Sequence, residues 1–142
     1  MGTGGVGGYF GARLAASGAD VTFIARGEHL RAMQASGLKI MSAKGDLLLK
    51  PAKATDKPGE VGVVDLVMIA VKLWSTEDAV REIAPMVGPN TTVVSFQNGV
   101  IATDQLLAAY GPQRVIGGVA NIAALIEAPG VIRHNGAMAR LI

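Results

Sequence analysis

The 142 residues are enough for one compact domain; half of them are apolar and 17% are charged, with a mean hydropathy of +0.39. The net charge of +2, scattered basic residues and an aromatic content of 4% argue against a nucleic-acid-binding surface. The absence of cysteine excludes disulfides and thiolate chemistry and fits a cytoplasmic protein. The apolar runs near 61–71 and 115–126 are shorter than the roughly 18 residues of a membrane span, so we expect no membrane segment.

The chain opens on a glycine-rich turn. Gly2, Gly4 and Gly7 form the pattern G-x-G-x-x-G. In dinucleotide-binding folds these glycines, in order, permit a tight turn, admit the pyrophosphate to the backbone and allow close packing of the helix on its strand. A helix is predicted over 5–17, and the free N–H groups at its start would hold an anion. A merely structural glycine turn is the alternative interpretation.

Downstream, helix-like and strand-like segments alternate. We expect helices over 28–35, 76–86 and 103–110, strands over 20–25, 63–71, 91–96 and 114–119, a hairpin of 38–41 and 46–49, a loop over 51–62 with one short edge strand, and short strands around a turn at 129–130. The nearly continuous apolar strands favour a Rossmann-like, doubly wound α/β fold, with a mostly parallel sheet and helices on both of its faces.

The strand over 20–25 ends at Arg26, a position that discriminates between nucleotides. Enzymes that use NAD carry Asp or Glu there to accept from the ribose hydroxyls. An arginine suits a 2′-phosphate through charge-assisted, bidentate hydrogen bonds. We therefore expect NADP(H) rather than NAD(H) as the cofactor. A solvated charge at a strand end is the alternative.

Two further residues follow buried strands. Lys72 comes after the run VMIAV, and Asn98 lies in SFQNGV after the next strand. Ligands of open α/β sheets bind at the carboxyl ends of such strands. Lys72 could meet the cofactor there or be a surface lysine, and Asn98 could orient a substrate or a nicotinamide ribose or form an Asn-Gly turn.

Other polar and aromatic residues are interpreted as structural. Trp74 is expected to pack in the core or to cover the neighbouring loop, His29 to lie on a helix surface and His134 near a late turn. No H-x-x-H or paired-carboxylate spacing suggests a metal site.

Taken together, these motifs resemble one family over nearly the whole chain. Four stretches occur in the order found in ketopantoate reductases: GTGGVGGYFGARLAASGADVTFIARG, DLVMIAVKLWSTEDA, TTVVSFQNGV and GVANIAALIEAPGVIRHNG. The specificity comes from the combination of V-K-x-W, Q-N-G and P-G-V-I-R-H. The resemblance implies the amino-terminal, NADP-binding domain of an enzyme that reduces 2-dehydropantoate, or a similar 2-keto acid, to pantoate on the route to pantothenate and coenzyme A.

The resemblance also implies a set of cofactor-binding residues. Arg26 would hold the 2′-phosphate, Lys72 and Asn98 would contact the cofactor, Asn98 would also lie near the substrate, and Ala123 would touch the cofactor through its backbone. The pyrophosphate would be held by Gly2, Thr3, Gly4, Gly5, Val6 and Gly7.

Two departures from the family pattern concern the ends of the domain. The family has a strand before the glycine turn, whereas here only Met1 precedes Gly2. The family also has a helical second domain with the general-acid lysine, so no catalytic residue is expected among residues 1–142. We expect a domain truncated at both ends that has little or no reductase activity alone. The alternatives are a stand-alone NADP(H)-binding regulatory module, whose apolar surface a homo-oligomer would cover, and a fragment without function.

Overall fold

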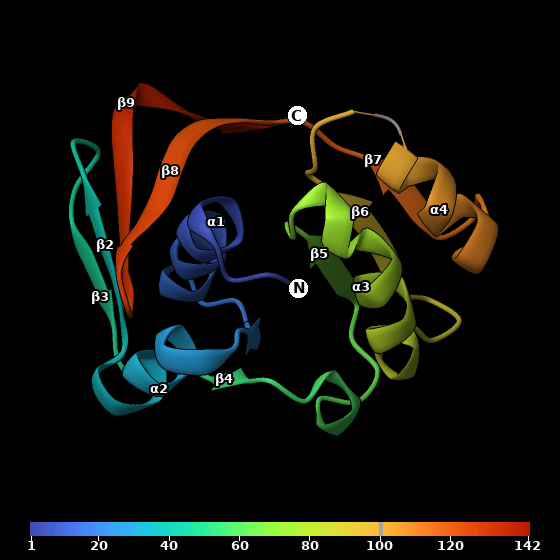
Figure 1. Ribbon diagram of the computed structural model, residues 1–142, viewed down its shortest axis with the longest axis horizontal. Coiled ribbons are helices and arrows are strands. Elements are labelled where there is room, and N and C mark those ends of the chain that lie inside the picture. The colour runs from blue at the N-terminus through green and yellow to red at the C-terminus, as the bar shows by residue number, and fades with distance from the viewer. Residues whose placement is uncertain (100) are drawn as a thin grey trace.

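The computed structural model describes residues 1–99 and 101–142 and shows an α/β fold with three sheets (Figure 1). Two of the sheets are entirely parallel, which confirms the predicted class. One pairs β1 (Phe23–Ile24) with β4 (Ala54–Thr55). The other has the order β5 (Leu66–Ile69), β6 (Thr92–Ser95) and β7 (Val115–Gly117).

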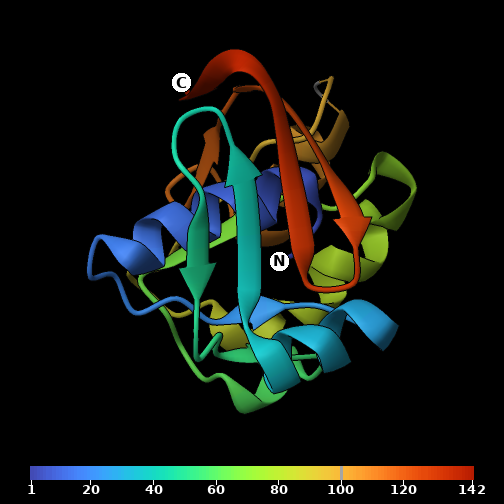
Figure 2. The same cartoon turned by 90° about the vertical axis from the view of Figure 1, so that its left-hand side faces the viewer.

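The third sheet is mixed and forms one side of the molecule (Figure 2). Its order is β3 (Leu47–Leu49), β2 (Leu38–Ser42), β9 (Val131–Leu141) and β8 (Ala120–Ala128). β2 and β3 form the predicted antiparallel hairpin, and β9 joins β2 in parallel. The short strands expected around residues 129–130 are instead a long antiparallel hairpin of 9 and 11 residues.

The four α-helices agree with the sequence in type and position. They are α1 (Gly5–Ala16), α2 (Gly27–Ser36), α3 (Thr76–Glu82) and α4 (Ile101–Tyr110). The helix expected over 76–86 divides into α3 and a 3₁₀ turn at Ala84–Met86, where Pro85 supplies no N–H for an α-helical bond. α1 lies between the mixed sheet and β5, and α3 and α4 lie at the other end of the molecule (Figure 1). None of the helices in the described part of the chain is long and apolar enough to cross a membrane.

Two separate hydrophobic clusters stabilise the two ends of the molecule. One joins α1 and α2 to the mixed sheet and includes Met33, Leu38 and Ile132. The other joins β5 and β6 to α3 and α4 through residues such as Ile69 and Leu106. Burial of each such side chain contributes about 1.5–3 kcal/mol.

The edges of β1 and β5 that lack a strand partner among the described residues line one groove of about 620 Å³. At one end of this groove, the first residues of the chain form hydrogen bonds to both sides. The amide of Ala70 donates to the carbonyl oxygen of Met1 at 2.9 Å, and the amide of Thr3 donates to the carbonyl oxygen of Ile24 at 3.0 Å. Residues 1–3 are therefore placed as the last residues of a strand between β1 and β5 would be.

Candidate functional site

The glycines of the opening turn differ in what surrounds them. Gly2 has φ +90°, and a Cβ there would lie 2.7 Å from Val71 Cγ1. A Cβ on Gly7 would lie 2.2 Å from the carbonyl oxygen of Gly2. A Cβ on Gly4, by contrast, would have no heavy atom within 4 Å. Gly2 and Gly7 are therefore required by the fold, while Gly4 leaves open space at the start of α1.

That open space lies at a helix end with unsatisfied donors. Gly4 is the N-cap of α1, and its carbonyl oxygen accepts from the Gly8 amide at 2.8 Å. No side chain in the described part of the chain caps the helix. The first N–H groups of a helix have no partner within it, and the helix dipole favours negative charge there. This end of α1 can therefore receive a phosphate group.

The other residues of the turn hold it in place. The hydroxyl of Thr3 is buried and donates to the carbonyl oxygen of Ile24 at 2.9 Å, which fixes the turn to β1. Gly5 lies close to β8, since a Cβ there would be 2.1 Å from the carbonyl oxygen of Ala124. Val6 is half-buried in the first turn of α1.

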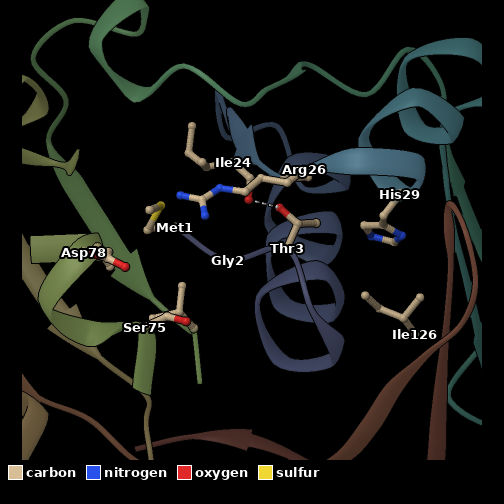
Figure 3. A pocket seen from close by; sticks show the side chains of 12 residues that line it. Met1, Gly2, Thr3, Ile24, Arg26, His29, Ser75, Asp78 and Ile126 are labelled. Atoms are coloured by element: carbon tan, nitrogen blue, oxygen red, sulfur yellow. Dashed lines mark hydrogen bonds between the residues drawn. The ribbon is translucent and has the colours of Figure 1, made fainter. Parts of the chain in front are cut away.

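A pocket of about 200 Å³ opens beside this turn (Figure 3). It is lined by the first three residues of the chain, the end of β1, α2, the start of α3 and Ile126 of β8. Figure 3 shows Arg26 extending across the pocket, with Ser75 and Asp78 on one side and His29 on the other. Typical pockets for small ligands measure 300–1,000 Å³, so this one has room for part of a dinucleotide.

Arg26 lies just after β1, at the strand end that the sequence predicted, and is also the N-cap residue of α2. Its side chain is largely exposed, and its guanidinium forms an ion pair with the Oε1 atom of Glu82. The other carboxylate oxygen of Glu82, Oε2, is buried and has no hydrogen-bond partner among the described residues. The positive charge expected beside a nucleotide ribose is thus already paired with a carboxylate from α3.

His29 is part of the pocket wall, which corrects its assignment to a helix surface. The Gly130 amide donates to its Nδ1 atom at 3.0 Å, so the neutral ring carries its proton on Nε2. Burial is the larger influence on His29 and lowers its pKa, while the nearby backbone of Thr3 acts in the opposite direction. The Nε2 atom is buried and has no hydrogen-bond partner among the described residues. Arg26 precedes α2 and His29 lies in its first turn, so the closeness of the two residues in the sequence is the one local signal for this position.

Lys72 and Asn98 lie on adjacent loops at the carboxyl ends of β5 and β6 and are both exposed. Gln97, which the sequence did not single out for a role, connects the two loops. Its Nε2 atom donates to the carbonyl oxygen of Val71 at 2.9 Å and to the hydroxyl oxygen of Thr76 at 2.8 Å. Gln97 therefore holds the loop of Asn98 against the loop of Lys72, through its bond to Val71.

Ala123 lies on β8, exposed and next to a β-bulge, where the pairing with β9 shifts after Ile122. The adjacent residue, Ala124, is the one that approaches Gly5. The structure thus places Ala123 next to the strand segment that meets the glycine turn. Ala123 and the pair of Lys72 and Asn98 lie outside the lining of the pocket around Arg26.

Of the two remaining structural interpretations, core packing of Trp74 is corrected and the structural role of His134 is confirmed. Trp74 is 83% exposed, so it does not pack in the core. His134 is buried in β9, where its Nδ1 atom lies 2.8 Å from the Ser42 hydroxyl and its Nε2 atom lies 2.9 Å from the Met138 carbonyl oxygen. Both ring nitrogens are thereby satisfied within the fold.

Comparison with known proteins assigns the chain to a family. The family described as ketopantoate reductase PanE/ApbA matches residues 1–142. The chain belongs to the ketopantoate reductase family. It is 40% identical to a 2-dehydropantoate 2-reductase of Mesorhizobium japonicum, over 94% of this chain and 47% of that protein. It is 34% identical to an uncharacterized oxidoreductase, YkpB, of Bacillus subtilis, over 100% of this chain and 46% of that protein.

Solved structures in the family share this fold. The crystal structure of 2-dehydropantoate 2-reductase from Geobacter metallireducens superposes with a TM-score of 0.94 and 35% identity, over 99% of this chain and 46% of that one. The chain spans about half the length of the curated relatives it matches. The comparisons confirm the Rossmann-like fold and the family resemblance inferred from the motifs, and the matched relatives are named as reductases and an oxidoreductase.

Proposed function

We propose that residues 1–142 bind NADP(H) for a reductase that converts 2-dehydropantoate, or a similar 2-keto acid, to pantoate or the corresponding hydroxy acid. The observation that carries the proposal is the open space at Gly4, at the uncapped start of α1, with Arg26 extending across the adjacent pocket. A pyrophosphate fits the first feature and a 2′-phosphate the second. The family match supports the reductase activity.

The residues of this chain then have separate tasks. The amides at the start of α1 hold the pyrophosphate, and the guanidinium of Arg26 binds the 2′-phosphate through two parallel N–H donors. Lys72, Asn98 and the backbone of Ala123 contact the nucleotide farther along, and the Asn98 amide also orients the substrate, since it can donate and accept. When bound, the nicotinamide supplies the hydride for the keto carbon.

Hydride transfer also needs a proton for the developing alkoxide, from a group within hydrogen-bond reach. We propose that this group lies outside residues 1–142, in a further domain, and that the pantothenate route is the setting of the reaction. We also propose that a strand preceding Met1 fills the groove between β1 and β5. Residues 1–142 alone are then expected to bind nucleotide without reducing 2-dehydropantoate.

The test is a nucleotide titration of the 142-residue chain. NADPH binding is followed by the change in nicotinamide fluorescence, for the parent chain and for Arg26→Ala. We expect the parent to bind NADPH more tightly than NADH, and Arg26→Ala to lose about tenfold in NADPH affinity with little change for NADH. Equal loss for both nucleotides would remove Arg26 from the 2′-phosphate site, and no binding of either would overturn the proposal. Measured turnover of 2-dehydropantoate would place the proton donor within this chain.

A further inference from the structure

The partner of Arg26 comes from the other end of the molecule. Arg26 caps α2, which packs in the cluster with the mixed sheet, whereas Glu82 ends α3, which packs with β5 and β6. The ion pair therefore spans the space between the two hydrophobic clusters, beside the pocket. Glu82 is two-thirds buried, with a side-chain exposure of 33%, against 64% for Arg26.

Arg26 is the only residue in the described part of the chain that donates a hydrogen bond to the Glu82 carboxylate. Oε1 accepts from the guanidinium, and Oε2 is buried with no partner. Glu82 itself does not line the pocket, but Asp78, one turn earlier on α3, does and is paired with Arg81 of its own helix. α3 thus contributes one carboxylate to the pocket lining, Asp78, and a second one, Glu82, that reaches the pocket-lining Arg26 through the ion pair.

This ion pair disfavours the binding of a nucleotide that carries a 2′-phosphate. A 2′-phosphate that binds the guanidinium of Arg26 through two parallel N–H donors competes with Glu82 for those donors and brings a second negative charge close to the Glu82 carboxylate. Like charges at short range are mutually unfavourable, more so where burial limits solvent screening. A ribose with a free 2′-hydroxyl is neutral there and leaves the ion pair intact.

We propose that Glu82 sets the preference between nucleotides with and without a 2′-phosphate, by competing with that phosphate for Arg26. The inference rests on the proposed function, because it requires the nucleotide ribose to lie at Arg26. In this arrangement Arg26 favours NADP(H) and Glu82 limits that preference. Glu82 is a selectivity residue that acts through Arg26, and its removal is expected to make the chain more selective for the phosphorylated nucleotide.

The experiment compares dissociation constants for NADPH and NADH across four forms of the 142-residue chain: the parent, Glu82→Gln, Glu82→Asp and Arg26→Ala. Glu82→Gln keeps the side-chain shape and removes the charge. We expect it to tighten NADPH binding by about 3- to 10-fold and to change NADH binding by less than about twofold. Glu82→Asp keeps the charge on a shorter stem and should give an intermediate NADPH affinity.

Glu77→Gln is the matched control. Glu77 lies on the same helix, forms an ion pair with Arg81 and is largely exposed, so its variant removes one charge from α3 without touching Arg26. It should leave the ratio of the two dissociation constants within about twofold of the parent, which separates a local effect from a change in net charge. Circular dichroism of each variant confirms that it is folded.

The outcomes separate this inference from the proposed function. If Arg26→Ala weakens NADPH binding selectively but Glu82→Gln leaves the NADPH to NADH ratio unchanged or lowers it, the role of Glu82 is overturned and nucleotide binding stands. An equal gain for Glu77→Gln also overturns it. If the parent binds neither nucleotide, or Arg26→Ala affects both equally, the proposed function fails and this inference fails with it.

Discussion

The amino nitrogen of Met1 donates to the carbonyl oxygen of Met68 at 2.6 Å, in the position that a strand's peptide N–H would take beside β5. The next bond along the same edge runs from the Ala70 amide to the Met1 carbonyl oxygen. Together they form the alternation of a parallel ladder. A terminal amine therefore lies at the end of an apolar groove where a peptide N–H would fit, and burial there disfavours its protonated form.

Burial of this amine predicts a specific pH dependence of stability. Burial lowers the pKa of the Met1 amino group from about 8.0 to about 6. Between these values the unfolded chain carries a proton that the folded chain lacks, so the free energy of unfolding decreases as the pH falls from 8 to 6, by on the order of 2 kcal/mol. Urea unfolding at closely spaced pH values measures this change.

The control is the same chain acetylated at Met1, whose stability should be nearly flat between pH 8 and 7. The lowered pKa of His29 adds a separate loss below about pH 6.5, because the unfolded chain again binds the proton first. His29→Gln removes only that part. A pH 8-to-7 loss that survives acetylation would show that another group titrates there.

Filling the groove is expected to stabilise the domain. An extension of five alternating valine and isoleucine residues before Met1 would pair with the edges of β1 and β5 that have no strand partner in the described ranges. It would bury apolar side chains among residues such as Phe23 and Val67. We expect a gain of about 2 kcal/mol or more, which raises the melting temperature by roughly 8 °C. A Gly/Ser extension of equal length is the control, and equal melting temperatures for the two would mean that the groove takes no strand.

The glycine turn allows binding and folding to be separated. Gly4→Ala adds a methyl group where no atom lies within 4 Å, so the melting temperature should change by no more than about 2 °C, while NADPH affinity falls tenfold or more because the phosphate loses its approach. Gly7→Ala places a Cβ against the carbonyl oxygen of Gly2 and should destabilise the fold by about 1–3 kcal/mol. Thermal unfolding and the fluorescence titration give the two readouts. Equal losses of affinity and stability in both variants would contradict the separate roles.

Local patterns in the sequence were sufficient for much of this fold. The run VVDLVMIAV predicted a buried parallel strand because its apolar residues are continuous, and β5 lies within it. The β8–β9 hairpin was underestimated because one-sided burial is weak there: Leu125, Ile126 and Met138 are exposed, so apolar and polar positions do not alternate clearly. Only residues 131–134 of β9 also pair with β2, which lies far away in the sequence, and this contact leaves no local pattern.

The sequence predicted the positions of single site residues but not the side-chain contacts between them. The position of Arg26 followed from a strand end, whereas its bond to Glu82 joins residues 56 apart and left no local pattern. The role of Gln97 is of the same kind, because its partner Val71 belongs to a different strand loop. Long-range side-chain contacts depend on the packing of α2 against one cluster and α3 against the other, and sequence spacing does not determine that packing.

The Gln97 contacts lead to a last prediction. Gln97→Leu keeps a similar volume but removes the donors to Val71 and Thr76, so a carbonyl oxygen that is paired in the folded chain loses that partner. We expect a loss of about 1–2 kcal/mol in the free energy of unfolding, and lower NADPH affinity because the loops of Lys72 and Asn98 are no longer held together. Gln105→Leu, at an exposed position of α4, is the control for the added apolar surface. Urea unfolding and NADPH titration of both variants test this, and equal effects at the two positions would show that Gln97 does not connect the loops in solution.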